Sequence, residues 1–225
     1  MRLLDATEVK IEWTDITRWA GREHKAYSQI RASGVHVSDI IRYNYFGHLD
    51  LGSDERKKKE MEAAEDLGDP TIMPLRMCIG MAVENWLVGL YPDLNWQPGG
   101  LSKDGISGSI DGFSMMFNIN RLLYPNPDGS FAIEEIKVTW KSFRNREILR
   151  EVIWMWQLAA YCYIWDTRLA RLHVVWVNGD YSHGENWGPR YFRYLIEFKS
   201  HELDRLWKSL FLKNREQALL MKKES

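Results

Sequence analysis

The alternation of apolar and polar side chains predicts a strand over residues 131–139, Phe-Ala-Ile-Glu-Glu-Ile-Lys-Val-Thr. Side chains on a strand point alternately to its two faces. Glu135, Lys137 and Thr139 therefore share one face, whereas Ile136 and Val138 share the other and indicate a core behind it. Similar runs predict further strands over about 105–113, 171–177 and 191–198.

The chain also predicts a short helix over about 39–45, helices over about 74–90 and 143–165, and a charged amphipathic helix over 201–222. Ser38 is the expected N-cap of the first helix, and Asp39 is favourable in its first turn. The order helix, strands, helix, strands predicts an α/β fold with helices flanking a mixed central β-sheet. Residues 1–35 show no clear pattern, and residues 50–72 are heavily charged.

At 225 residues the chain is long enough for one domain with appended helices. We expect a charged, helical N-terminal extension over 1–72, a core over 73–200 and a C-terminal amphipathic helix over 201–225 that packs on the core. A lid, an arch over a ligand or a partner-binding surface are the roles left open for residues 1–72.

The composition, with 45% hydrophobic residues and 11 Trp, is typical of a globular protein. The two cysteines, Cys78 and Cys162, are too few for a four-cysteine cluster, and nothing indicates a disulfide framework. The N-terminus lacks the apolar region of a signal peptide, and no run approaches the roughly 20 apolar residues of a membrane-spanning helix. We therefore expect a cytoplasmic protein with no membrane segment.

A net charge of −1 argues against a globally basic nucleic-acid-binding surface. Any contact with nucleic acid must come from a local patch. Residues 137–150 are the candidate, because they contain five basic residues and one acidic residue.

The residue types at the start of this basic segment can seat a divalent cation beside a water molecule. Glu135 and Lys137 lie on one strand face, and Asp111 ends the run Gly108-Ser-Ile-Asp111 before them. Mg²⁺ prefers oxygen ligands, which two carboxylates and the phosphate oxygens of a substrate supply. The lysine cannot ligate the metal, but it can orient the attacking water.

Glu-x-Lys alone is a weak pattern, because it occurs five times in the chain and a solvated ion pair explains most copies. The strongest rival is Glu197 with Lys199, which ends a strand-like run and follows Asp180. However, Asp180 lies in a turn-like sequence, Asn-Gly-Asp-Tyr.

Four short motifs occur in order within residues 36–200: Gly80-Met-Ala-Val-Glu84, Gly108-Ser-Ile-Asp111, Glu135-Ile-Lys137 and Gln157-Leu-Ala-Ala-Tyr161. As an ordered set, they resemble the motifs of the PD-(D/E)XK nucleases, especially the branch with the RecB nuclease domain, lambda-type exonucleases and CRISPR-associated exonucleases. The resemblance implies a restriction-endonuclease-like αβββαβ core. It also implies one or two Mg²⁺ or Mn²⁺ ions, held by Glu84, Asp111, Glu135 and the backbone carbonyl of Ile136.

In this resemblance Asp111, Glu135 and Lys137 are the catalytic residues, and Lys137 positions the water. It also implies that Gln157 and Tyr161 contact the nucleic acid. The basic side chains Lys141 and Arg144 would join them on the phosphate backbone. No iron–sulfur cluster is expected, because the cysteines that hold it in some relatives are missing.

Several alternatives accompany these assignments. Pro127-Asp128 lies closer to Glu135 than Asp111 does, but it reads as a turn. Glu134 is expected on the opposite face from Glu135 and would replace it if a bulge shifted the register. Glu84 is also compatible with an exposed helix carboxylate, and Gln157 and Tyr161 with core packing that leaves a polar tip.

The resemblance implies a DNA exonuclease for phage or mobile-element recombination or repair, which would act in the host cytoplasm if phage-encoded. DNA is the expected partner, and a single-strand annealing or recombination protein and a homo-oligomer are left open. Two alternatives remain: a structure-specific or single-strand endonuclease of the same fold, and a non-catalytic nucleic-acid-binding or scaffold protein.

Overall fold

The computed structural model describes residues 1–17, 35–46, 72–96, 98–115, 131–144, 147–178 and 188–224. Three features of the sequence interpretation lie outside these residues: most of the charged segment 50–72, the turn around Asp128, and Asp180.

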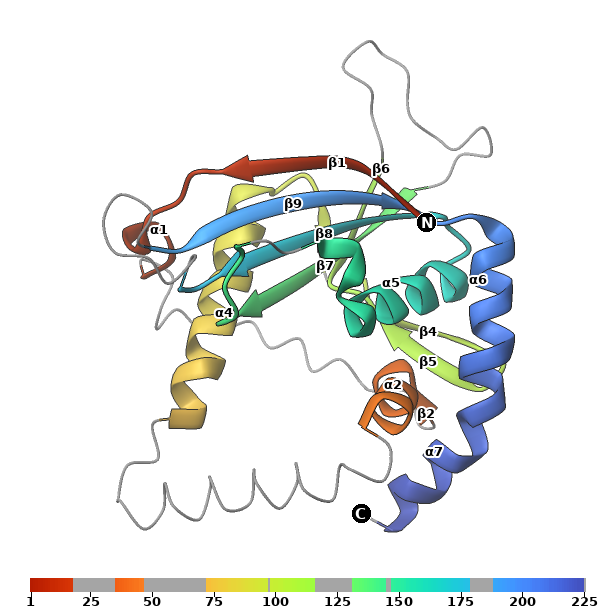
Figure 1. Ribbon diagram of the computed structural model, residues 1–225. Helices are drawn as coiled ribbons and strands as arrows, with labels where there is room; N and C mark the ends of the chain where they lie inside the picture. The colour runs from red at the N-terminus through yellow and green to blue at the C-terminus, as the bar shows by residue number, and fades with distance from the viewer. Residues whose placement is uncertain are drawn as a thin grey trace.

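The core of the fold is a six-stranded sheet with the strand order β1-β9-β8-β7-β6-β3. In this sheet β7 and β8 are parallel and each other neighbouring pair is antiparallel. Figure 1 shows β1 along the upper edge, next to β9. The strands, in sheet order, are β1 (Arg2–Val9), β9 (Arg190–Glu197), β8 (Leu169–Trp176), β7 (Phe131–Thr139), β6 (Gly112–Met115) and β3 (Asn95–Trp96).

A second, three-stranded sheet is formed by β2 (Val35–His36), β5 (Ile106–Ser109) and β4 (Gly100–Lys103), in that order. The chain passes from β5 in this sheet to β6 in the main sheet within two residues, Ile110 and Asp111. The strand expected over 105–113 is therefore two strands that belong to different sheets.

Helices cover both faces of the main sheet. On one face, α5 (Val152–Ile164) packs on side chains of β7, β8 and β9, together with α2 (Val37–Phe46) and the C-terminal helices. On the other, α4 (Ile72–Leu90) and the short α1 (Trp13–Thr17) form a smaller apolar cluster. The C-terminal helices α6 (Ser200–Leu206), η3 (Trp207–Leu212, a π-helix) and α7 (Lys213–Glu224) follow one another as a continuous, curved helix in Figure 1.

This arrangement confirms the predicted fold class, a mixed α/β sheet flanked by helices. Helix α4, the main-sheet strands β3, β6 and β7, helix α5 and strand β8 follow one another in the expected αβββαβ order, with β4 and β5 of the second sheet inserted between β3 and β6. The parallel β7–α5–β8 crossover carries α5 across one face of the sheet. No helix in the described part of the chain combines the length and apolar character needed to cross a bilayer.

Residues 2–9 differ from the expected helical extension, because they form β1 and pair along most of β9. The segment is an edge strand with largely exposed side chains, so it lacks the apolar alternation that identifies a half-buried strand. The division of the chain into three parts stays a prediction.

Two helices begin elsewhere than expected. Helix α2 starts at Val37, so Ser38 lies inside it and is not its N-cap; instead, the Asp39 carboxylate accepts a hydrogen bond from the backbone N–H of His36 at 2.9 Å. The helix expected from 143 begins at Val152, after a 3₁₀ turn, η2 (Ile148–Arg150).

Gly108 allows α5 to pack closely on β5. A Cβ atom at this position would lie 2.9 Å from Cδ1 of Tyr161 and 3.0 Å from Cδ1 of Ile164. By contrast, a Cβ atom at Gly80 in α4 would meet no described atom within 4 Å. Only the first glycine is therefore required by the packing of the described residues.

We predict that Gly108→Ala lowers the free energy of unfolding by about 1–3 kcal/mol, because the added methyl group overpacks the α5–β5 contact. Gly80→Ala is the matched control. It should raise the free energy of unfolding by up to about 1 kcal/mol, because alanine favours a helix interior. Urea unfolding of both variants measures the difference, and equal effects would contradict this account.

Candidate functional site

Asp111 lies where the chain passes between the two sheets, and this places its carboxylate beside the middle of β7. Asp111 Oδ2 accepts a hydrogen bond of 2.7 Å from the backbone N–H of Ile136, 25 positions later in the chain. The long separation between Asp111 and the Glu-x-Lys motif is therefore closed by direct contact in the fold.

Glu135 and Lys137 share one face of β7, as the strand alternation predicts, and this face is turned toward α5. Glu135 Oε1 accepts hydrogen bonds from Lys137 Nζ at 2.5 Å and from Gln157 Nε2 at 3.0 Å. Glu135 Oε2 is buried and has no hydrogen-bond partner among the described residues. An unpaired buried carboxylate oxygen is costly, so this oxygen is a favourable place for an electropositive ligand to bind.

Burial makes both carboxylates hard to ionise, and the charge of Glu135 adds to this effect at Asp111. The pKa of Asp111 is raised well above its ordinary value, first by burial and then by the charge of Glu135, against the opposing effects of Lys137 and the Ile136 amide. Burial also raises the pKa of Glu135, although the Lys137 ammonium opposes it. A divalent cation between the two groups would favour their ionised forms.

Glu84 acts on this site from α4, because its charge raises the pKa of both Asp111 and Glu135. However, no three or more His, Cys, Asp or Glu side chains among the residues described here are arranged to hold a metal ion by themselves. Asp111 and Glu135 are the carboxylates that the fold brings together. Glu84 and the Ile136 carbonyl stay predicted ligands.

Gln157 and Tyr161 point into the same site from α5. Gln157 Nε2 donates to the Tyr161 hydroxyl at 2.9 Å as well as to Glu135. Tyr161 is 6% exposed and its ring lies close to Gly108, so most of this side chain is core with a polar tip. Sequence interpretation missed the direct bond between Gln157 and Glu135, and nucleic-acid contact by Gln157 and Tyr161 stays a prediction.

The two basic residues predicted to contact phosphate differ in their surroundings. Lys141 Nζ donates to Glu151 at 2.9 Å and lies 5.6 Å from the ring centroid of Trp154. Arg144 is exposed. Both lie in the segment that follows β7 in the chain.

Glu134 lies on the opposite face of β7 from Glu135, as the alternation predicts, and is fully buried. Its carboxylate binds the side chains of Ser114, Arg171 and His173. These partners were missed in the sequence. The sequence does contain a hint of them, because Arg171 and His173 lie two positions apart and therefore share one face of a strand that is otherwise apolar.

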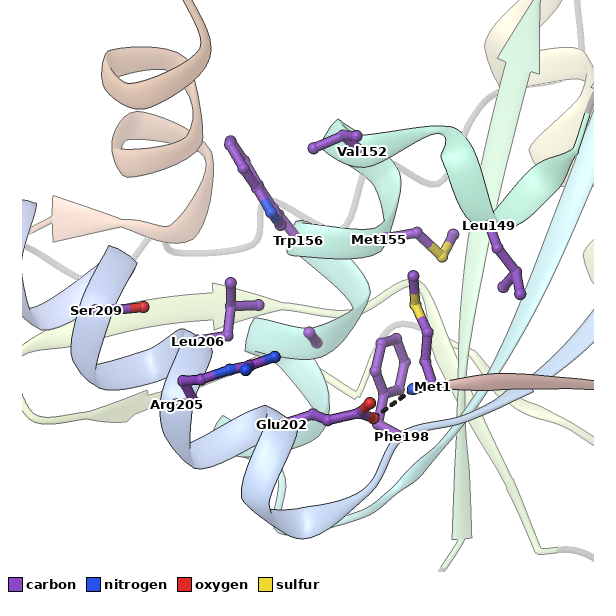
Figure 2. Close-up of a pocket in the computed structure, with 11 residues that line it drawn as sticks. Met1, Leu149, Val152, Met155, Trp156, Phe198, Glu202, Arg205, Leu206 and Ser209 are labelled. Carbon is purple, nitrogen blue, oxygen red and sulfur yellow. Dashed lines mark hydrogen bonds and ion pairs between the residues drawn. The ribbon is translucent and has the colours of Figure 1, made fainter.

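A pocket of about 250 Å³ lies between α5 and α6 (Figure 2). Its wall is largely apolar, with Leu149, Val152, Met155, Trp156 and Phe198 among the lining side chains. None of the predicted catalytic or metal-binding residues lines this pocket. The chemistry of the carboxylate pair belongs to a different place in the fold.

The raised pKa values predict how stability depends on pH without metal. The folded state binds protons at Asp111 and Glu135 more tightly than the unfolded state does. The two groups therefore stabilise the fold most at a pH below their pKa values in the unfolded chain, which for Asp is ordinarily 3.8. This stabilisation is lost as the pH rises through the raised folded values. In chelator, Asp111→Asn should therefore unfold at higher urea than wild type near neutral pH, and the difference should shrink in acid.

Glu197→Gln is the control, because Glu197 is paired with Arg2 at 2.7 Å on the surface. A lower midpoint for Asp111→Asn at neutral pH, with an unchanged pH profile, would contradict the electrostatic account.

No family model and no curated protein matches the sequence. Among solved structures, a protein designated SSO0001 is similar, with 13% identity over 88% of this chain and 84% of that chain and a TM-score of 0.45. A phage-related exonuclease from Haemophilus somnus 129PT is 11% identical over 97% of both chains, with a TM-score of 0.36. At TM-scores this low, neither similarity establishes a shared activity.

Proposed function

We propose that this protein is a metal-dependent nuclease that hydrolyses phosphodiester bonds. The main support is the environment of Glu135, which is buried beside Asp111. Lys137 binds one oxygen of its carboxylate, and the other oxygen has no hydrogen-bond partner among the described residues. A buried carboxylate pair beside a lysine is suited to phosphoryl chemistry at a divalent cation.

The donor set fits Mg²⁺ or Mn²⁺, as one ion or two. Asp111 and Glu135 would hold the cation, with Glu84 and the Ile136 carbonyl as further ligands. Mg²⁺ in phosphate-processing sites takes one or two carboxylates and completes its shell with water and phosphate oxygens, so a closed cage of protein ligands is not needed. When bound, the cation neutralises charge on the scissile phosphate and acidifies a water molecule.

The hydrogen bonds of Glu135 determine which of its oxygens is available. Lys137 and Gln157 both donate to Oε1, and Tyr161 lies within hydrogen-bond distance of Gln157. Oε1 is thereby held, and Oε2 is the oxygen left to face a cation. This arrangement fixes the orientation of the carboxylate before a ligand arrives.

Lys137 supplies a positive charge next to the carboxylate pair. Its ammonium can donate to the attacking water and to the phosphate oxygen on which charge accumulates, which stabilises the transition state. Arg144 and Lys141 follow on the chain and would bind the phosphate backbone, which gives affinity without sequence reading.

Within this function, we propose a DNA exonuclease of phage or mobile-element recombination or repair, acting in the cytoplasm on DNA ends. The motif resemblance supports this narrower choice. An endonuclease of the same fold uses the same chemistry, and a non-catalytic nucleic-acid-binding protein is the alternative of another class. Digestion assays separate the three.

We predict that Asp111→Asn and Lys137→Met each lower Mg²⁺- or Mn²⁺-dependent cleavage of end-labelled DNA by about 10²–10³-fold, because each removes charge at the reacting phosphate. Glu197→Gln and Lys199→Met change the other Glu-x-Lys pair at the end of a strand and should retain activity. Folded wild-type protein that binds DNA but cleaves neither DNA nor RNA with either metal would support the non-catalytic alternative.

We further expect wild-type protein to digest linear duplex DNA and to leave covalently closed circles intact. An exonuclease needs an end, so products should shorten from the termini when resolved on a denaturing gel. Cleavage of closed circles at a comparable rate would identify an endonuclease instead.

A further inference from the structure

A buried polar cluster lies on the face of the sheet opposite the candidate site. Glu134 is its centre, and we call Ser114, Glu134, Arg171 and His173 the Glu134 cluster. Glu134 Oε1 accepts hydrogen bonds from Ser114 Oγ and from Arg171 at 2.7 Å, and Oε2 bonds His173 Nε2 at 2.7 Å. Glu134 and His173 are both completely buried.

The cluster joins three neighbouring strands through one carboxylate. Arg171 and His173 belong to β8, Glu134 to β7 and Ser114 to β6. Arg171 lies directly opposite Glu134 in the parallel β7–β8 pair. On the other side, Gly112 lies opposite Glu134 and Ser114 is the diagonal neighbour, so no intervening side chain separates the hydroxyl from the carboxylate.

The β6 side of this cluster determines where Asp111 lies. Strand β6 has only four residues, and Asp111 is the residue just before it. A slip of one residue between β6 and β7 would reverse the faces of β6 and move Asp111 away from the Ile136 amide. The Ser114–Glu134 bond opposes such a slip, because it forms only when Ser114 and Glu134 share a face.

We propose that the Glu134 cluster is a positioning device for Asp111 and that Ser114 is the positioning residue through which it acts. The two consecutive glutamates of β7 then have different tasks. Glu135 faces the reacting phosphate, and Glu134 holds β6 in the register that brings Asp111 beside Glu135. The catalytic meaning of this device rests on the proposed function, because it assumes that Asp111 is a metal ligand.

The same carboxylate has a second branch, which provides a control. His173 Nδ1 lies 2.7 Å from the Tyr191 hydroxyl, and the Tyr191 hydroxyl lies 3.4 Å from that of Tyr91. This branch runs to β9 and to the residue after α4, so it does not touch β6. Tyr191→Phe therefore weakens the cluster without removing the link to Ser114.

Amide hydrogen exchange at Ile136 tests the positioning directly, because this N–H donates to Asp111. Ser114→Ala should raise its exchange rate by about tenfold, the factor expected when one buried hydrogen bond is lost, relative to amides in β8. Ser114→Thr keeps a hydroxyl and should restore protection of the Ile136 amide. Tyr191→Phe should leave the ratio of the Ile136 exchange rate to the rates of the β8 amides unchanged. A rise shared equally by β8, or the same ratio for Ser114→Ala and Tyr191→Phe, would overturn the inference.

Calorimetric titration of the full-length variants with Mn²⁺ gives a second readout. Ser114→Ala should weaken Mn²⁺ binding by about tenfold and Tyr191→Phe should not, because outer groups that orient a ligand affect affinity. Wild-type protein that binds no Mn²⁺ would instead refute the proposed function, and the Ile136 exchange would still decide whether Ser114 positions Asp111. Unchanged Mn²⁺ affinity in Ser114→Ala, beside normal wild-type binding, would refute the positioning role.

Discussion

The structure depends most on how β7 buries two consecutive glutamates. Glu134 and Glu135 point to opposite faces of a central strand and are 0% and 3% exposed. A buried carboxylate is tolerated only with hydrogen bonds or opposite charge around it. Each face must therefore provide its own partners, and these come from β6, β8, α5 and, through Lys137, β7 itself.

The two faces meet this requirement to different degrees. Glu134 has a serine, an arginine and a histidine around it, so both of its oxygens are paired. Glu135 has Lys137 and Gln157 on one oxygen, and the other oxygen is unpaired. The same residue type, one position apart, thus forms a complete internal network on one side and an incomplete one on the other. Incompleteness is expected where a ligand supplies the missing contact.

Sequence patterns predicted the elements whose side chains alternate between core and site. The strand at 131–139 agrees with β7, and the shared face of Glu135 and Lys137 follows from the strand period alone. Strand β1 was not predicted, because an exposed edge strand lacks that alternation. The break at Asp111 was missed because a local pattern does not show that Ile106–Ser109 and Gly112–Met115 belong to different sheets. The bond from Gln157 to Glu135 requires the β7–α5 packing, which no local pattern contains.

Stability conflicts with the proposed activity at this site, and the arrangement of the sheet confines this conflict to one face. Asp111 and Glu135 have raised pKa values because they are buried together, so their ionised forms destabilise the metal-free fold. Repulsion between them would tend to separate β6 from β7, since Asp111 lies just before β6 and Glu135 lies on β7. The Ser114–Glu134 bond and the Ile136–Asp111 bond both join those two strands. The satisfied network on the opposite face therefore helps to hold the two strands in the register that keeps Asp111 and Glu135 together.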